Sequence, residues 1–270
     1  MNDPVWVQGG VGIRTEANRS DERLPPGGWR TGGSGAGHTR RRDLSTAAYE
    51  RLRDAIVTLK LAPGAALIEV ELCDRLRVSR TPMRAALQRL QQEGLAVIAG
   101  SGRLRRLVVS PLTFDDMREL FLMVGALDGL AARLAAGLEP ARRGPLLQEM
   151  ERLNGELRCL AGSSELWDTA LAQDLDVRFH QSYEQTAAGP QLLLELHALH
   201  ARRARYVRVY TEALVRARNL RESALEHQAI IDAVKSGDRD AAERAAGLNY
   251  HNALERYATI VKTVGERGAW

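Results

Sequence analysis

The sequence predicts a mainly α-helical chain with two folded domains behind a flexible N-terminal tail. Its 270 residues, 44% of them hydrophobic, are enough to bury two cores without disulfides or a structural metal. Apolar residues recur at helical spacing through most of residues 43–264, and the aromatic content of 5% disfavours a β-sandwich, a barrel or a stacking platform for single strands. The charge is uneven, since residues 43–110 carry eleven basic and seven acidic side chains whereas residues 111–270 carry 20 and 23. A polyanionic partner is therefore expected at the N-terminal domain.

Neither a membrane span nor a secretory signal is predicted. No run approaches 18 uncharged apolar residues, and Met1–Gly10 has no basic region leading into an apolar run. Cys73 and Cys159 lie far apart and form no CxxC motif, so we expect free, buried thiols in a reducing compartment. These features predict a cytoplasmic protein.

Residues 1–42 form the tail. They contain nine of the 24 glycines and no apolar periodicity, so they cannot bury enough surface to offset the entropic cost of ordering. We predict a disordered Gly/Arg-rich segment. The run Arg40–Arg42 fits either a phosphate contact or a solvated basic linker.

Residues 43–112 have the element order of a winged helix-turn-helix domain. The predicted elements are a helix from Asp43 to before Pro63–Gly64, a helix over Glu69–Leu76, a helix that begins at Ser79 or Thr81 and ends at Gly94, and strands over 95–98 and 104–109 joined around Gly100–Gly102. In such domains the third helix enters the major groove of DNA, and its N-terminal residues reach base edges.

The candidate DNA contacts are polar side chains at the start of the third helix and in the hairpin. Met83, Leu87 and Leu90 face the core, which leaves the polar N-terminal end of this helix outward. Arginine suits bidentate pairing with guanine and the binding of phosphates. A single arginine here would be explained as ordinary solvated surface. Several arginines together in a segment with the element order of a winged helix-turn-helix favour DNA binding. The predicted contacts are Ser79, Arg80, Thr81, Arg84, Arg103 and Arg105.

After Pro111 the pattern is almost entirely helical. Short connections between amphipathic segments predict an antiparallel all-α bundle over residues 113–264. The six predicted segments are 113–138, 141–161, 164–188, 190–217, 219–236 and 238–264.

Four side chains of the bundle form a candidate metal site. Asp176 and His180 are four residues apart on one predicted helix and share a face, while His227 and His251 lie on two further helices. One carboxylate and three imidazoles suit a divalent transition ion such as zinc, nickel or manganese, with positions left for water or an anion. From spacing alone, an ordinary Asp–His helix pair and two partly buried histidines are the favoured interpretation.

A second polar pair lies on the predicted helix 190–217, between the helices that carry His180 and His227. His200 and Arg203 share the face of Leu196 and Val207, so Arg203 is a candidate contact for a ligand carboxylate. The other interpretation places the arginines of this helix in solvent or at a subunit interface.

The run Val78–Leu95 closely resembles the recognition segment of the GntR family of bacterial transcriptional regulators. The match spans about residues 43–112, with two departures from the family pattern. Ala85 replaces the acidic residue that usually follows the motif's Arg84. The hairpin, or wing, is about three residues longer than usual and lacks its usual proline.

The helical part resembles the FadR-like ligand-binding domain called FCD, over about 113–262. The segments that carry the resemblance are Leu127–Ala132, Asp176–His180, Glu226–Ala233, Gly237–Asp238 and His251. The resemblance implies that Asp176, His180, His227 and His251 are metal ligands. The family commonly has an arginine at the position of Val124, so this chain's ligand is expected to be smaller, less charged or held differently.

Together the two resemblances imply a ligand-responsive transcriptional regulator rather than an enzyme. We expect a homodimeric repressor that binds double-stranded DNA at a palindromic operator and is released by a small carboxylate bound at the metal site.

Two other functions fit parts of the sequence. A metal-dependent enzyme built on the bundle is possible in principle, but the sequence has no H-E-x-x-H, G-x-S-x-G or P-loop motif. The second is an architectural DNA-binding protein without an effector, in which the large helical domain would have no role other than dimerisation. The regulator is distinguished from both of these alternatives if the protein binds one DNA site specifically and a small acid reverses that binding.

Overall fold

The computed structural model describes residues 36–162, 168–214 and 217–268, which form two compact units divided after Ser110. Residues 1–35 of the predicted tail lie outside the described residues. Residues 36–42 do not continue that tail, because the first helix, α1, spans Ala36–Val57. This part of the prediction is wrong. Arginine is a good helix former, so the run Arg40–Arg42 extends a helix that the apolar residues after it stabilise.

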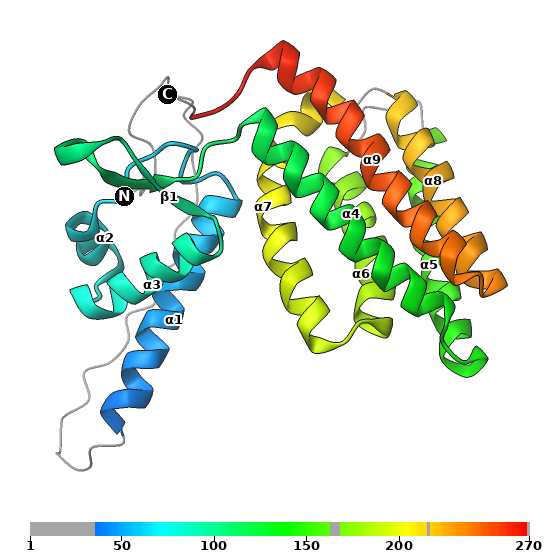
Figure 1. Cartoon of the computed structure of the whole chain (residues 1–270), viewed down its shortest axis with the longest axis horizontal. Coiled ribbons are helices and arrows are strands. Elements are labelled where there is room, and N and C mark those ends of the chain that lie inside the picture. The colour runs from blue at the N-terminus through cyan, green and yellow to red at the C-terminus, as the bar shows by residue number, and fades with distance from the viewer. Residues whose placement is uncertain (1–35, 163–167, 215–216, 269–270) are drawn as a thin grey trace. The chain divides into compact units, whose positions relative to one another are not determined.

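The N-terminal unit is a winged helix-turn-helix, as the sequence predicts. It contains α1, α2 (Glu69–Leu76), α3 (Arg80–Gln92) and an antiparallel hairpin of β1 (Ala96–Ala99) and β2 (Arg106–Val109) (Figure 1). Hydrogen bonds from Gly64 N–H to the Val109 carbonyl and from Leu67 N–H to the Leu107 carbonyl, each 2.9 Å, attach the preceding loop to β2. The core gathers the apolar faces of all these elements, including Leu52, Ile56, Met83, Leu90, Leu95 and Val109.

A tight turn connects α2 to α3. Arg77 adopts a left-handed φ of 53° after the last turn of α2, and Ser79 precedes α3 in an extended conformation. Pro82 lies in the first turn of α3, where an amide hydrogen would have no helical partner. Because Met83, Leu87 and Leu90 are buried, the N-terminal end of α3 keeps its polar residues in solvent.

The C-terminal unit is the predicted antiparallel bundle. Its described helices are α4 (Phe114–Ala136), α5 (Pro140–Gly162), α6 (Thr169–Ala187), α7 (Pro190–Leu214), α8 (Ala217–Ser236) and α9 (Arg239–Val264). The side chains of Thr113, Asp168 and Asp238 accept backbone N–H groups at the starts of α4, α6 and α9.

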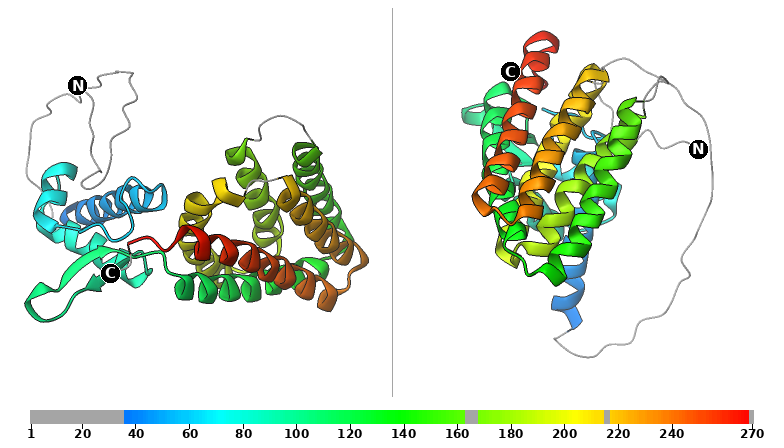
Figure 2. Two further views of the ribbon diagram at one scale, coloured as in Figure 1. Left: turned by 90° about the horizontal axis from the view of Figure 1, so that it is seen from above. Right: turned by 90° about the vertical axis from the view of Figure 1, so that its right-hand side faces the viewer.

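Within the bundle, α4 lies along α9, while α5 packs on α6 and α8 (Figures 1 and 2). Gly125 permits the close approach of α4 and α9, because a Cβ there would lie 2.9 Å from the Cβ of Tyr250. Both α6 and α8 pack on α4 and α5, and together they carry the cluster of Asp176, His180 and His227 described below.

Two further expectations are tested by the described residues. None of their helices is long and apolar enough to cross a membrane. Cys73 is half-buried and Cys159 is exposed, and both are free. The expectation of free thiols is confirmed, but the expectation that they are buried is wrong for Cys159, which lies on the solvent side of α5.

Candidate metal centre and nucleic-acid interface

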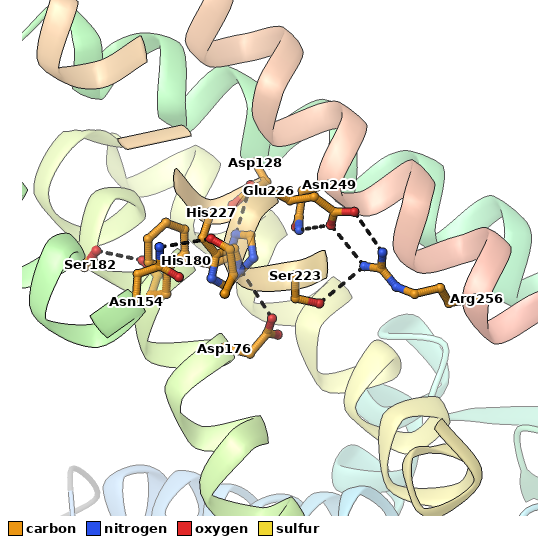
Figure 3. Close-up of polar contacts among 12 residues, drawn as sticks. Asp128, Asn154, Asp176, His180, Ser182, Ser223, Glu226, His227, Asn249 and Arg256 are labelled. Carbon is orange, nitrogen blue, oxygen red and sulfur yellow. Dashed lines mark hydrogen bonds and ion pairs between the residues drawn. The ribbon is translucent and has the colours of Figure 1, made fainter. Parts of the chain in front are cut away.

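Three of the four predicted metal ligands come together inside the bundle. Asp176 and His180 on α6 and His227 on α8 offer ligand atoms that all lie within 4.8 Å of one another (Figure 3). Both histidines are buried, and the side chain of Asp176 is 31% exposed. One carboxylate and two imidazoles on facing helices are a donor set that divalent transition ions accept.

The orientation of His180 is set by a fully buried carboxylate on α4. His180 Nδ1 lies 3.2 Å from Asp128 Oδ2 and 2.7 Å from the hydroxyl of Tyr183, which itself donates to Asp128. Burial lowers the pKa of His180, but the charge of Asp128 outweighs it and raises this pKa overall. Since Nδ1 is occupied, Nε2 is the nitrogen left for an ion. A carboxylate behind a metal-binding histidine is a recurrent feature of such sites.

His227 is the least satisfied polar group of the cluster. Both of its ring nitrogens are buried without a hydrogen-bond partner, and Nε2 comes no closer to Asp176 Oδ1 than 3.5 Å. Its ring stacks on Phe179 at 3.9 Å between centroids. Burial lowers the pKa of His227, against the opposing effect of Asp176, so the ring is neutral and has a lone pair to offer. A buried nitrogen without a partner needs an explanation, and a bound ion provides one.

Asp176 is ionised in this setting. Burial raises its pKa, but the close polar contact with His227 and the charges of His180 and Arg203 outweigh burial and lower the pKa well below its usual range. The residues therefore present an anionic oxygen next to the neutral imidazole of His227. This combination fits a divalent cation.

His251 does not join the cluster. It is exposed on the outer face of α9, where it lines a separate groove with Leu122 and Gly247. Residues two apart on a helix point in nearly opposite directions, and the inward position belongs to Asn249. Asn249 is 5% exposed and donates from Nδ2 to Glu226 Oε2 at 2.8 Å. The prediction of His251 as the fourth ligand is therefore corrected.

Two adjoining cavities open onto the cluster. They have volumes of about 110 and 430 Å³ and share Asp176, His180 and Arg203 in their walls. Both volumes exceed the space that one water needs, and the larger one falls within the range of small-molecule pockets.

Both predicted effector residues lie at these cavities. Arg203 is buried, its Nε has no hydrogen-bond partner, and its Nη2 lies 3.8 Å from Asp176. His200 lines the larger cavity, and its Nε2 lies 2.8 Å from Oε1 of the buried Glu184. A guanidinium with an unpaired donor next to a cavity is suited to bind a carboxylate.

Several residues beside the cluster were not predicted from the sequence. Arg256 on α9 lines the smaller cavity and forms hydrogen bonds of 2.8 and 3.0 Å to Glu226 (Figure 3). Asp128 was noted only as part of a motif, although a lone carboxylate on the apolar face of α4 is a signal for a buried polar role. Val124 lies in an apolar cluster with Phe121 and Leu199, so the guanidiniums of the cavity come from α7 and α9 instead.

The predicted DNA contacts all lie on the surface of the N-terminal unit. Ser79, Arg80, Thr81 and Arg84 are exposed at the N-terminal end of α3, and Arg103 and Arg105 are exposed between β1 and β2. Arg84 Nε donates to Glu69 Oε2 of α2 at 2.8 Å, which holds the guanidinium beside the start of α3.

Comparison with known proteins identifies both units. Residues 44–104 match the family model "Bacterial regulatory proteins, gntR family", and residues 119–251 match that of the FCD domain. An uncharacterized HTH-type transcriptional regulator in an unstable DNA locus of Streptomyces ambofaciens is 34% identical over 75% of this chain and 78% of its own length. A probable D-xylose utilization operon transcriptional repressor of Paenarthrobacter nicotinovorans is 28% identical over 82% of this chain and 92% of its own.

A solved structure agrees with this assignment at the level of the fold. E. coli McbR/YncC has a TM-score of 0.59 at 20% identity, covering 82% of this chain and 99% of that one. Sequence and structure together lead to one conclusion: the chain belongs to the GntR family of bacterial transcriptional regulators, and its effector unit is an FCD domain.

Proposed function

We propose that this regulator is a cytoplasmic, homodimeric repressor that a small carboxylate releases from its operator. The observation that carries the proposal is the cluster of Asp176, His180 and His227, in which neither nitrogen of His227 has a hydrogen-bond partner, beside Arg203, whose Nε also has none. A polar cluster left unsatisfied at a cavity costs stability unless a ligand completes it.

In this proposal Asp176, His180 and His227 hold a divalent zinc, nickel or manganese ion. Such an ion supplies positive charge and open coordination positions for an anionic ligand. Asp128 fixes the ring of His180 through Nδ1. Asn249 occupies the inward place on α9 where His251 was expected.

The effector carboxylate is bound between the metal centre and Arg203. Arg203 contributes the fixed donors of a buried guanidinium, and His200 faces the same cavity from one turn earlier on α7. Arg256 is already neutralised by Glu226, so Arg203 is the guanidinium available for the ligand's charge.

The DNA contacts in this proposal are the six predicted residues. Arg80, Thr81 and Arg84 reach base edges from the start of α3, and Ser79 binds phosphate there. Arg103 and Arg105 bind the backbone beside the groove that α3 enters. Exposure of all six residues and the HTH geometry support this assignment.

An apolar stripe on the bundle supports the homodimer. Leu122, Leu130 and Leu134 are exposed on one face of α4, and Leu248 is exposed on the adjacent α9. A second copy of the same stripe buries these side chains in a twofold interface and brings two α3 helices to the two halves of a palindrome. Leu130→Glu should convert the dimer to monomer in sedimentation velocity; an unchanged dimer would place the interface elsewhere.

The helix α7 connects the cavity to the start of the bundle. Three residues after Arg203, the Tyr206 hydroxyl accepts from Thr113 N–H at 3.2 Å and donates to Asp116 at 2.8 Å, and Arg202 also binds Asp116. Because Thr113 and Asp116 lie in the first turn after the division at Ser110, a shift of α7 on effector binding is transmitted there. Coupling of this kind is typically about 1–3 kcal/mol.

The test is release of DNA by a chemically defined probe. The full chain, loaded with zinc, is bound to an operator duplex that it has selected from a random pool, and small mono-, di- and tricarboxylates are added one at a time. At least one should lower operator occupancy in wild type, and the same acid should have little effect on Arg203→Met. If no acid changed operator occupancy, the proposal that the effector is a carboxylate would be contradicted. If an acid increased operator occupancy, the proposal that effector binding releases a repressor would be contradicted.

A further inference from the structure

The tip of the wing presents an exposed apolar side chain. Leu104 is 81% exposed, the highest value among the large hydrophobic residues that the structure describes. It ends the short 3₁₀ turn Gly102–Leu104 between β1 and β2, and Arg103, Arg105 and Arg106 next to it are all exposed. A single exposed leucine is ordinary on a protein surface, so exposure alone assigns no role. The shape and charge of this tip add two independent observations.

The turn that carries Leu104 has a defined shape. Gly100 has φ +82°, and a Cβ there would lie 2.6 Å from the carbonyl oxygen of Leu104. The Leu104 N–H donates to the Ser101 carbonyl at 3.1 Å. A close backbone contact of this kind needs glycine at position 100, so the residue at the tip is held in place relative to its arginine neighbours.

The charge around Leu104 has one sign. Residues 94–110 contain Arg103, Arg105 and Arg106 and no acidic residue. Such a hairpin is attracted to a polyanion. Proteins that bind the minor groove frequently insert leucine or another apolar side chain between base steps there, next to arginine or lysine contacts. Leucine among arginines matches this combination.

We propose that Leu104 enters the minor groove of the operator as an apolar wedge, with Arg103 and Arg105 on the flanking phosphates. The hairpin extends beyond the helices of its unit, which leaves its tip free for this contact (Figure 2). A wedge is accommodated most easily at a flexible pyrimidine–purine step, so Leu104 adds sequence preference outside the bases that α3 reads. This inference rests on the DNA contacts of the proposed function.

The experiment compares two truncations on one hairpin. Full-length wild type, Leu104→Ala and the control Ile98→Ala, which shortens another exposed apolar side chain on β1, are titrated onto the selected operator and onto a random duplex at several salt concentrations. Leu104→Ala should weaken operator binding about ten-fold, weaken random-duplex binding less, and keep the salt slope. Arg103→Ala should lower that slope by about one instead. Ile98→Ala should match wild type.

A second readout is DNA bending in a circular-permutation assay, in which Leu104→Ala should bend the operator less than wild type. Operator affinity of Leu104→Ala equal to that of Ile98→Ala would overturn the wedge, and so would an equal loss on operator and random duplex. If wild type itself preferred no sequence, the proposed DNA contacts would fail together with the wedge. If wild type preferred the operator and Leu104→Ala bound it as tightly as wild type does, only the wedge would be overturned.

Discussion

The two units of this regulator place the ionisable residues of their candidate sites in opposite environments. In the N-terminal unit the arginines of α3 and of the wing are exposed, and two of those on α3 form ion pairs at the surface, Arg84 with Glu69 and Arg89 with Glu93. In the C-terminal unit Asp128, His180, His227 and Arg203 are buried. Exposed charges cost little to maintain and attract a large polyanion at long range. Buried charges are costly without partners, and for that reason they discriminate between small ligands.

This contrast predicts that removing a buried carboxylate has the largest effect on stability. Asp128→Ala removes the buried carboxylate that both His180 Nδ1 and the Tyr183 hydroxyl contact and leaves these two groups only each other, so the free energy of unfolding of the bundle should fall by about 3 kcal/mol. Urea denaturation followed by circular dichroism measures it. Asp128→Asn, which keeps a hydrogen-bond acceptor, should lose less stability. Equal stability of wild type and both variants would contradict the distinction between buried ionisable groups in one unit and exposed ones in the other.

The exposed recognition residues should affect binding without affecting stability. Arg84→Ala should lower operator affinity about ten-fold and relax sequence preference, because one base contact is lost, while the melting temperature stays unchanged. Fluorescence anisotropy at a fixed salt concentration measures the affinity. Arg89→Ala, at the opposite end of α3, is the matched control. Unchanged affinity of Arg84→Ala would exclude this residue from base recognition.

The proposed coupling between the cavity and the start of α4 should be visible in a variant that leaves the cavity lining and the DNA-binding residues unchanged. Tyr206→Phe keeps the ring but removes the hydrogen bonds to Thr113 and Asp116. Operator affinity without effector should remain near wild type, whereas the concentration of the releasing acid should rise about five-fold, since coupling is weakened. Calorimetry of acid binding supplies the control, because a direct loss of effector affinity of the same size would contradict a role in coupling.

The smallest effect is expected for the exposed ion pair itself. Glu69→Ala removes the partner of Arg84, and exposed pairs contribute little because water and salt screen them. The melting temperature should change by no more than about 1 °C. A drop as large as that of Asp128→Ala would show that exposure is not what separates the two units.

Local patterns were sufficient to predict most of the fold. Breakers such as Glu139–Pro140 and Gly237–Asp238 mark the ends of bundle helices because glycine and proline act on the backbone locally. The start of α1 was missed because tail composition was given more weight than the helix propensity of Arg40–Arg42. Tertiary support for a helix cannot be read from composition.

The resemblance to the FCD domain, rather than spacing, assigned Asp176, His180 and His227 to one site, because their spacing alone fits an ordinary helix pair and a buried histidine. The pairing of His180 with Asp128 was not predicted, since it joins positions 52 residues apart. His251 was predicted from the resemblance to the FCD domain, although the buried positions Ala242, Ala246 and Asn249 mark the inner face of α9. Helical phase was the better guide, because residue type does not decide which way a side chain points.

The most direct test of the metal centre is the metal content of three proteins purified without a nickel column or chelator. Elemental analysis should find about one transition ion per chain in wild type and in the control His251→Ala, whose side chain lies outside the cluster. His227→Ala should retain almost none while its folding and operator binding stay intact. Full metal content in His227→Ala, or none in wild type even after reloading with zinc, would contradict the account.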